Sequence, residues 1–382
     1  MGREIKTILR ESRRTMEKIE SGFILPSAAF TIRRSQIRFY KPLNKPPQMG
    51  DVIYGEVRLI GQHSSLENAS GRIHNVHDGT KAIFVFGNRY APDFYEGLIP
   101  DEATDEVDLV ARSGIVGIAK TKNSMIKDPT KVKVLGYTCD KSGNVLNTRQ
   151  FSLINPRRSE KKLPRAKMIL ICGTSMNSGK SMAAAACCRA LSSAGYKVRA
   201  AKVTGTASLK DILLMNDAGA SPYADFTYLG YPSTYLLPED ELLKVFNQLD
   251  LKYANNPKNF WVVEFADGII QRETAFLLNS SEVRKRVHKL IFCANDAFGA
   301  IGGLDVLKKE FGLVPDLLSG ICSISPLHIR ELTAFTNIPV FNSAEADINE
   351  LATVLRDASR HCLPVEIRTT DLQKSLPIKD VV

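Results

Sequence analysis

Long apolar runs are missing from this chain of 382 residues, so no segment is expected to cross a membrane. The first residues are charged throughout and lack the apolar stretch of a secretory signal. Cysteine is scarce as well, with seven residues and no CxxC pair, and several of them stand inside apolar runs. Such cysteines are typical of buried thiols in a reducing compartment, which favours a cytoplasmic location and argues against a zinc site.

Acidic residues are outnumbered by basic ones, 41 against 51, and the formal net charge is +10. The excess gathers near residues 33–45 and 157–167. A basic surface and linker is the simpler interpretation, and an anionic partner such as RNA or a polyphosphate is the alternative. Proteins that bind single strands interleave aromatic side chains with basic ones, and only Phe30, Phe39 and Tyr40 lie near the first stretch. Nucleic acid is therefore not the favoured partner.

Changes in composition divide the sequence into four segments. Residues 1–48 are expected to form a charged helix, over 4–20, and a proline-rich connector. Residues 49–154 contain at least five short strands separated by turn signals, which predicts a small all-β barrel or sandwich. Residues 155–167 read as a basic linker, and residues 168–382 alternate strands with helices, the last strand at 338–344. This alternation predicts an α/β domain whose parallel sheet is covered on both faces.

The segment FGNRYAPDFYEGLIP, residues 86–100, stands out within the β domain. It combines polar and charged side chains with aromatic ones, and it is expected to form a long loop. Two interpretations remain open: a loop held in place by its aromatic residues, or a loop that contacts a ligand or the other domain.

The motif GTSMNSGKS follows the apolar strand MILIC and opens an alanine-rich helix. Its glycines let the backbone curl around phosphate oxygens, which the loop N–H groups and the helix N-terminus then bind. Lys180 would reach the β- and γ-phosphates, and the hydroxyl of Ser181 would bind Mg²⁺. The motif therefore predicts a P-loop NTPase domain that binds ATP, or another nucleoside triphosphate, with Mg²⁺. The expected nucleotide-binding residues are Gly173, Thr174, Ser175, Met176, Asn177, Ser178, Gly179, Lys180 and Ser181, with Asn295 as a candidate contact to the base.

Five residues separate Gly173 from Gly179, one more than in the usual P-loop, and a loop of this length resembles that of dethiobiotin synthetase. Three later segments, AKVTGT, NDAG and VVEFADG, are similar to segments of the same family. The resemblance covers most of residues 168–345 and implies that Lys202 contacts substrate and phosphate. It also implies that Asp217 and Glu264 help Ser181 to hold Mg²⁺, and that the protein is a homodimer.

The sequence departs from that family at Ser175 and Asn177, where the family has acidic residues, so the family's own substrate is not predicted. A second resemblance concerns residues 204–230, TGTASLKDILLMNDAGASPYADFTYLG. This stretch is similar to one in a P-loop family that includes a D-glutamate N-acetyltransferase. That resemblance implies that the loop holds the phosphates of coenzyme A.

These residues together predict a Mg-ATP-dependent enzyme, similar to a ligase or a kinase, that activates a small carboxylate or similar acceptor by phosphoryl transfer. Lys180 and Lys202 would act in catalysis, and Arg272, just beyond the strand of Glu264, would stabilise the charge of the transferred phosphate. Two alternatives stay open. One is a nucleotide-driven switch that binds a partner through its β domain, and the other is an acyltransferase that uses coenzyme A.

Overall fold

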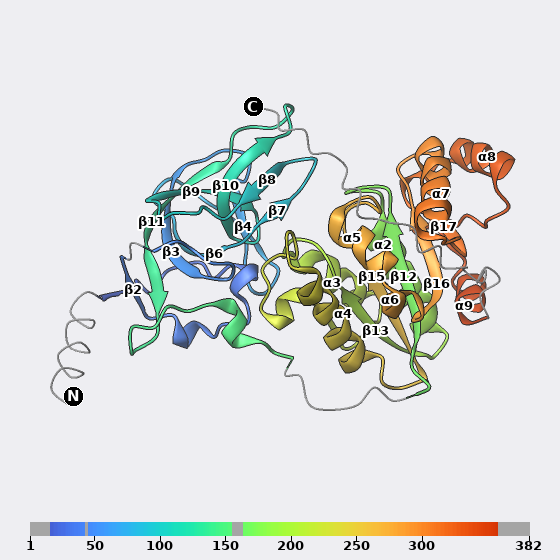
Figure 1. The fold of residues 1–382 in the computed structure, drawn as a ribbon, viewed down its shortest axis with the longest axis horizontal. Coiled ribbons are helices and arrows are strands. Elements are labelled where there is room, and N and C mark those ends of the chain that lie inside the picture. Colours follow the sequence, from blue (N-terminus) through green and yellow to red (C-terminus); the bar gives the residue numbers. More distant parts are fainter. Residues whose placement is uncertain (1–15, 43–44, 155–162, 358–382) are drawn as a thin grey trace.

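The computed structural model describes residues 16–42, 45–154 and 163–357. Strands dominate the first part of the chain, and a sheet flanked by helices dominates the second (Figure 1). The helix expected over residues 4–20 falls mostly on residues 1–15, which lie outside the described residues. Its end is wrong: Glu17–Lys18 form strand β1, and Ile19 and Phe23 are buried in the core of the β domain.

Five strands of the β domain pair in a closed ring in the order β11–β3–β6–β10–β9 and back to β11. These strands are β3 (Val52–Leu59), β6 (Lys81–Phe86), β9 (Glu106–Ala111), β10 (Ile115–Lys122) and β11 (Thr130–Cys139). All pairs are antiparallel except β6 with β10. Closure leaves no unpaired edge in the ring, so the domain is a barrel, one of the two forms expected from the sequence.

Shorter elements extend the barrel. They are β1, β2 (Phe39–Lys41), β4 (Ser65–Glu67), β5 (Ile73–Asn75), β7 (Arg89–Tyr90), β8 (Tyr95–Leu98) and the 3₁₀ turns η1 (Ser27–Ala29), η2 (Arg34–Gln36) and η3 (Thr148–Phe151). β1 and β2 continue the sheet from β11, so the segment expected to be a connector is part of the domain. β7 and β8 pair with each other inside residues 86–100, which form a hairpin in place of the expected long loop.

The second domain is built on a parallel sheet of six strands in the order β14–β13–β15–β12–β16–β17. The strands are β12 (Lys167–Gly173), β13 (Lys197–Lys202), β14 (Tyr223–Asp225), β15 (Asn259–Glu264), β16 (Val287–Cys293) and β17 (Leu317–Ser319). Their carboxyl ends meet at one edge of the sheet, which is where open α/β sheets bind ligands. The strand expected at residues 338–344 is reduced to one bridge, between Leu318 and Val340.

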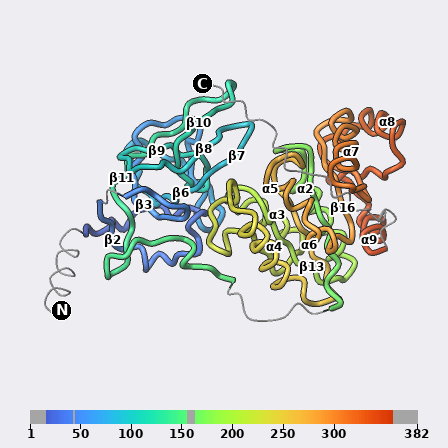
Figure 2. Tube along the Cα trace, in the orientation of Figure 1, coloured from blue at the N-terminus to red at the C-terminus, as the bar shows by residue number. Residues whose placement is uncertain are grey.

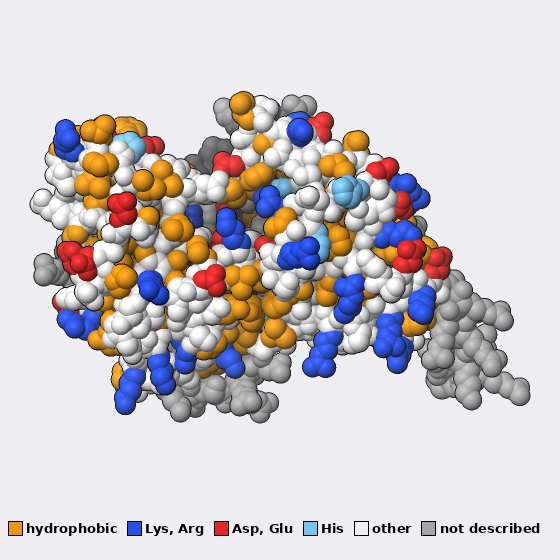
Figure 3. All heavy atoms as spheres, turned by 180° about the vertical axis from the view of Figure 1, so that it is seen from behind, with side chains coloured by type: hydrophobic (Ala, Val, Ile, Leu, Met, Phe, Trp, Pro, Cys, Tyr) orange, Lys and Arg blue, Asp and Glu red, His pale blue; other side chains and the backbone are white. Residues whose placement is uncertain are grey.

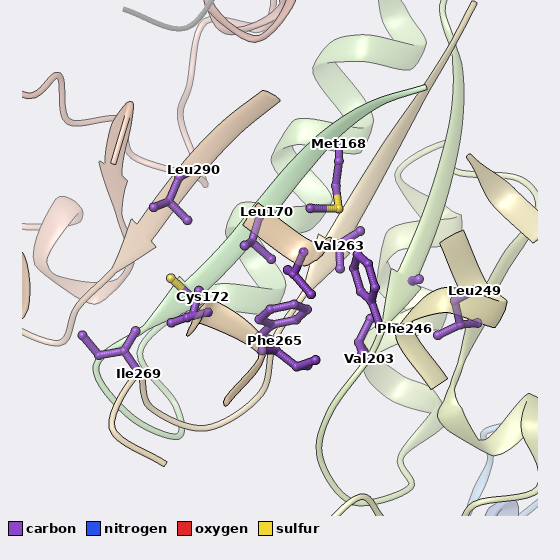
Figure 4. Close-up of a cluster of buried hydrophobic side chains, with 14 of the residues drawn as sticks. Met168, Leu170, Cys172, Val203, Phe246, Leu249, Val263, Phe265, Ile269 and Leu290 are labelled. Carbon is purple, nitrogen blue, oxygen red and sulfur yellow. The ribbon is translucent and has the colours of Figure 1, made fainter. Parts of the chain in front are cut away.

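Helices cover both faces of this sheet, as the apolar strands require. One face carries α2 (Lys180–Ser193), α3 (Leu209–Asp217) and α9 (Ile348–Arg356). The other carries α4 (Glu239–Tyr253), α5 (Arg272–Asn279), α6 (Ser281–Arg284), α7 (Ala297–Phe311) and α8 (Pro326–Phe335). Two further 3₁₀ turns are η4 (Phe226–Leu229) and η5 (Ile321–Ser323). Side chains of β12 alternate between the faces, so Leu170 and Cys172 pack with Phe265 and Leu290 (Figure 4), while Ile171 packs under α2.

Hydrogen bonds join the two domains, and the tube in Figure 2 shows α3 and its neighbouring loops lying beside the barrel. Thr148 Oγ1 donates to Gly230 O at 2.7 Å, and Leu153 N donates to Tyr228 O at 2.8 Å. Ala207, although it belongs to the second domain, is buried in a core cluster of the barrel. None of the described helices combines the length and apolar character that a bilayer crossing requires.

Candidate functional site

The P-loop, Gly173–Ser181, joins the end of β12 to the start of α2 in the arrangement that the motif predicted. Thr174 N donates to Cys293 O at 2.9 Å, which ties the loop to the neighbouring strand β16. Gly179 has a φ of 91°, and a side chain at this position would lie 2.8 Å from the Cα of Gly320. The loop is therefore compact, and its backbone conformation at Gly179 is one that favours glycine.

The loop after β17 packs against the backbone of the P-loop. Gly320 has a φ of 100°, and a Cβ on it would lie 2.3 Å from Ser178 O and 2.7 Å from Ala294 O. Ile321 N donates to the same Ser178 oxygen at 3.3 Å. Two glycines thus meet backbone to backbone, and neither tolerates a side chain without displacing the P-loop.

Lys180 is the first residue of α2 and is only 6% exposed. Its Nζ donates to Ser175 O at 2.6 Å and to Ser178 Oγ at 3.4 Å, so the ammonium group lies inside the loop that it follows. Burial lowers the pKa of Lys180, and the carboxylates of Glu264 and Asp267 offset only part of this effect. A buried cation with neutral hydrogen-bond partners is suited to bind phosphate.

Lys202, at the end of β13, lies between two carboxylates. Its Nζ donates to Asp211 Oδ2 and lies 3.4 Å from Glu264 Oε1. Burial alone would lower the pKa of Lys202, but the charges of Asp211 and Glu264 outweigh burial and raise it far above the ordinary value. Burial likewise acts to raise the pKa of Asp211, and the ammonium of Lys202 reverses this and lowers it. Lys202 and Asp211 are therefore both charged at neutral pH.

The same carboxylates fit a Mg²⁺ ion. Glu264 is 1% exposed, and its Oε2 has no hydrogen-bond partner in the described structure. Ser181 Oγ lies 3.4 Å from Asp211 Oδ1, so a hydroxyl and a second carboxylate are adjacent. No cluster of three His, Cys, Asp or Glu side chains suited to a metal occurs among the residues described. Mg²⁺ typically takes one or two carboxylates and completes its shell with phosphates and water, so Ser181, Asp211 and Glu264 suffice.

These groups line a pocket of about 790 Å³ between the two domains, called the interdomain pocket below. Figure 3 shows the hollow between the domains, with Lys and Arg side chains on its walls. The α/β wall includes Lys180, Ser181, Lys202, Asp211, Glu264 and Asp267. The barrel wall includes His63, Glu67, Arg89, Phe94, Arg112 and Ser113. The volume is within the range of sites that enclose small molecules.

Asp267 follows the end of β15 in a left-handed backbone conformation, with a φ of 59°. Burial raises the pKa of Asp267 to about 6, although the positive charges of Lys180, Lys202 and Arg89 act in the opposite direction. A non-glycine residue in this conformation is uncommon, and such residues cluster at functional sites.

The structure brings together most of the residues that the sequence singled out. Lys180, Ser181, Lys202 and Glu264 line the interdomain pocket, as do Met176, Asn177 and Gly179 of the P-loop. Ser175 lies beside the pocket and accepts a 3.0 Å hydrogen bond from Asn295 Nδ2, so Asn295 adjoins the loop. Gly173, Thr174 and Ser178 form its base.

Two predicted residues lie elsewhere. Asp217 is exposed at the far end of α3 and does not line the pocket, so the structure does not bring it to Ser181 and Glu264 as expected. The carboxylate beside Ser181 is that of Asp211, in the first turn of the same helix. The guanidinium of Arg272 donates to Leu237 O at 3.1 Å and Glu273 Oε1 at 2.7 Å, outside the pocket.

Residues 86–100 contact the other domain, one of the two roles left open by the sequence. Asp93 Oδ2 accepts a 2.6 Å hydrogen bond from Asn177 Nδ2 of the P-loop. Glu96 Oε1 accepts one of 2.7 Å from the hydroxyl of Tyr235. Arg89 of the same hairpin, like Asp211 and Asp267, was missed as a pocket residue. The only signal in the sequence was the density of polar residues in this hairpin.

Comparisons with known proteins identify no family to which the chain belongs. No family model and no curated protein matches the chain. Among solved structures, the signal recognition particle receptor FtsY of Elizabethkingia anophelis with GDP matches 55% of this chain and 69% of its own, at 10% identity and a TM-score of 0.33. FtsY of Mycoplasma mycoides covers 55% of this chain and 73% of its own (16% identity, TM-score 0.30). Chloroplast FtsY of Physcomitrella patens covers 54% of this chain and 71% of its own, at 12% identity and a TM-score of 0.33.

Proposed function

We propose that the protein is an enzyme that binds a nucleoside triphosphate with Mg²⁺ at the P-loop and transfers the γ-phosphoryl group to a small acceptor, a carboxylate or a similar oxyanion. The observation that carries this proposal is the direction in which the P-loop opens. Lys180 and Ser181, the side chains expected to bind phosphate, line a pocket that the barrel bounds on the opposite side. A pocket with two facing walls has room to hold an acceptor beside the nucleotide.

Lys180 would bind the β- and γ-phosphates. Its Nζ would then give up its hydrogen bonds to Ser175 O and Ser178 Oγ and donate to phosphate oxygens instead. Ser181, Asp211 and Glu264 would hold Mg²⁺, which when bound neutralises phosphate charge. Lys202 is fixed by its two carboxylates at the edge of the sheet, so its ammonium group would orient the acceptor and the transferred group with little loss of side-chain entropy. Asn295 would lie on the side of the nucleotide base. A homodimer remains part of the proposal.

A nucleotide-driven switch is the second candidate, and a specific contact favours it. The P-loop residue Asn177 bonds directly to Asp93 of the barrel, and the first turn of α3, with the Mg²⁺ candidate Asp211, is bonded to Glu67 of β4. A nucleotide that shifts either segment would change the contact between the domains. The switch predicts slow hydrolysis that no small molecule accelerates, whereas the enzyme predicts turnover that depends on an acceptor.

The test is the thermal stability of the full chain with Mg-ATP, Mg-GTP or acetyl-coenzyme A, for the wild type and for Lys180→Ala. A ligand at about 100 times its Kd adds about 2.7 kcal/mol of stability. We expect a shift with a nucleoside triphosphate that depends on Mg²⁺ and is lost in Lys180→Ala. Arg189→Ala is the matched control, since Arg189 is exposed on the same helix. A shift with acetyl-coenzyme A alone would replace phosphoryl transfer by acyl transfer, and no shift would refute the nucleotide site.

A further inference from the structure

Buried positive charges in this protein divide into two kinds. Four lysine or arginine residues are buried among the residues described: Arg89, Lys180, Lys202 and Lys289. Lys202 is paired with Asp211 and Glu264, and Lys289 is paired with Asp316. Arg89 and Lys180 form no ion pair with a described carboxylate, and both line the interdomain pocket. A buried charge without a counter-ion is costly, so both positions are suited to an anion supplied by a ligand.

The environment of Arg89 leaves hydrogen-bonding capacity unused. Its Nη1 donates to Val110 O and lies 2.9 Å from His63 Nε2, while its Nε has no partner in the described structure. Burial, followed by the charge of Arg89, lowers the pKa of His63 to about 3, so this histidine is neutral and adds no competing charge. The guanidinium carbon lies 5.0 Å from the centroid of the Phe94 ring, within the range of a cation–π contact. Burial lowers the pKa of Arg89 only to about 10, so it stays protonated at neutral pH.

A second unused donor lies in the same wall. Ser113 is 3% exposed, lines the pocket, and its Oγ has no hydrogen-bond partner in the described structure. Most buried polar side chains are bonded, so a buried hydroxyl without a partner that also lines the pocket is suited to a ligand. Among carboxylates, Asp267 of the opposite wall has the largest effect on the pKa of Arg89, which its charge raises. It forms no direct ion pair with Arg89.

We propose that Arg89 and Ser113 form a second anion subsite, which binds an acidic group of the acceptor at the barrel wall while the reacting carboxylate lies at the P-loop. The acceptor class is therefore a small molecule with two acidic groups, such as a dicarboxylate. This inference rests on the proposed function for the identity of the reacting end. The guanidinium is suited to the task because it binds a carboxylate through two parallel hydrogen bonds.

Calorimetric titration of the full chain with succinate and with malonate tests the subsite without any nucleotide. The variants are Arg89→Met and Ser113→Ala, with Arg58→Met as a control because Arg58 is an exposed arginine of the barrel away from the pocket. We expect at least one dicarboxylate to bind the wild type and Arg58→Met with similar affinity. Binding to Arg89→Met should be weaker by about tenfold or more, and binding to Ser113→Ala should be weakened less.

Melting temperature provides a second readout. Without ligand, Arg89→Met should melt at the temperature of the wild type or above it, because it removes an uncompensated buried charge. A purely structural arginine would instead lower the melting temperature without changing affinity. Should Arg89→Met fail to fold, Ser113→Ala decides the matter. Equal binding to wild type and variants, or no binding of either dicarboxylate, would overturn the subsite. If the wild type bound a dicarboxylate in an Arg89-dependent way but did not bind Mg-nucleotide, the proposed function would be overturned and the subsite would still be supported.

Discussion

Replacing Glu264 by glutamine separates the metal role of this residue from a structural one. The change keeps the shape of the side chain and removes a carboxylate whose Oε2 has no partner and whose Oε1 lies 3.4 Å from Lys202 Nζ. Lys202 keeps its bond to Asp211, so no buried charge is left without a counter-ion. Without ligand we therefore expect the free energy of unfolding to change by no more than about 1 kcal/mol.

With Mg-ATP the same variant should differ strongly from the wild type. At about 100 times the Kd, the wild type gains about 2.7 kcal/mol, and a hundredfold loss of affinity would leave about 0.4 kcal/mol at the same concentration. The difference corresponds to about 5–9 °C in Tm for a domain of this size. Melting curves with and without Mg-ATP measure it, with Glu241→Gln as control because Glu241 lies on α4 outside the pocket. An unchanged response to Mg-ATP would refute the metal assignment, and a ligand-free variant that unfolds would show that Glu264 is structural.

Three further results are expected. Gly320→Ala places a Cβ 2.3 Å from Ser178 O at a φ of 100°. Nucleotide affinity should therefore fall, and the free energy of unfolding should drop by at least about 1–2 kcal/mol. Gly302 lies on α7 with no atom within 4 Å of a Cβ built on it, so Gly302→Ala should raise the free energy of unfolding by about 0.5–1 kcal/mol. Urea unfolding of both variants gives the comparison, and equal stability would show that the P-loop tolerates displacement. Arg272→Ala should leave nucleotide turnover unchanged, because its guanidinium is bonded outside the pocket, and a large fall in kcat would restore its expected role. Since the folded pKa of Asp267, about 6, exceeds the ordinary 3.8, the folded protein binds more protons in that interval, and this residue makes stability fall as pH rises from about 4 to about 6. Asp267→Asn should remove that contribution, so its stability relative to the wild type should rise over the same interval, and a constant difference would contradict the reasoning.

The sequence was most informative where chemistry follows from local order. A strand, a glycine-rich loop and a helix placed Lys180 and Ser181 correctly, because their geometry is fixed within nine residues. Lys202 and Glu264 were identified as the ends of strands, and the parallel sheet brings all strand ends to one edge. The period of the elements and their order gave the positions of these residues, whereas the expected roles of Lys202 and Glu264 came from the family resemblance.

Contacts between segments distant in the chain were beyond the sequence. Asp217 was chosen for its position in a resembling segment, but α3 directs its first turn, with Asp211, toward the P-loop. Arg89 could not be identified because its burial arises when β7 and β8 fold back against the barrel and the second domain closes over them. The expected strand at residues 338–344 is reduced to one bridge because its backbone bonds to β17, through Pro339 O and Phe341 N, are both made with Leu318.

The start of α3 is fixed by the barrel. Leu209 N, one of the first backbone donors of the helix, bonds at 2.9 Å to Glu67 Oε1, and Ala207 is buried in the barrel core. The position of Asp211 therefore depends on a residue of the other domain, and one wall of the interdomain pocket owes part of its geometry to the opposite wall.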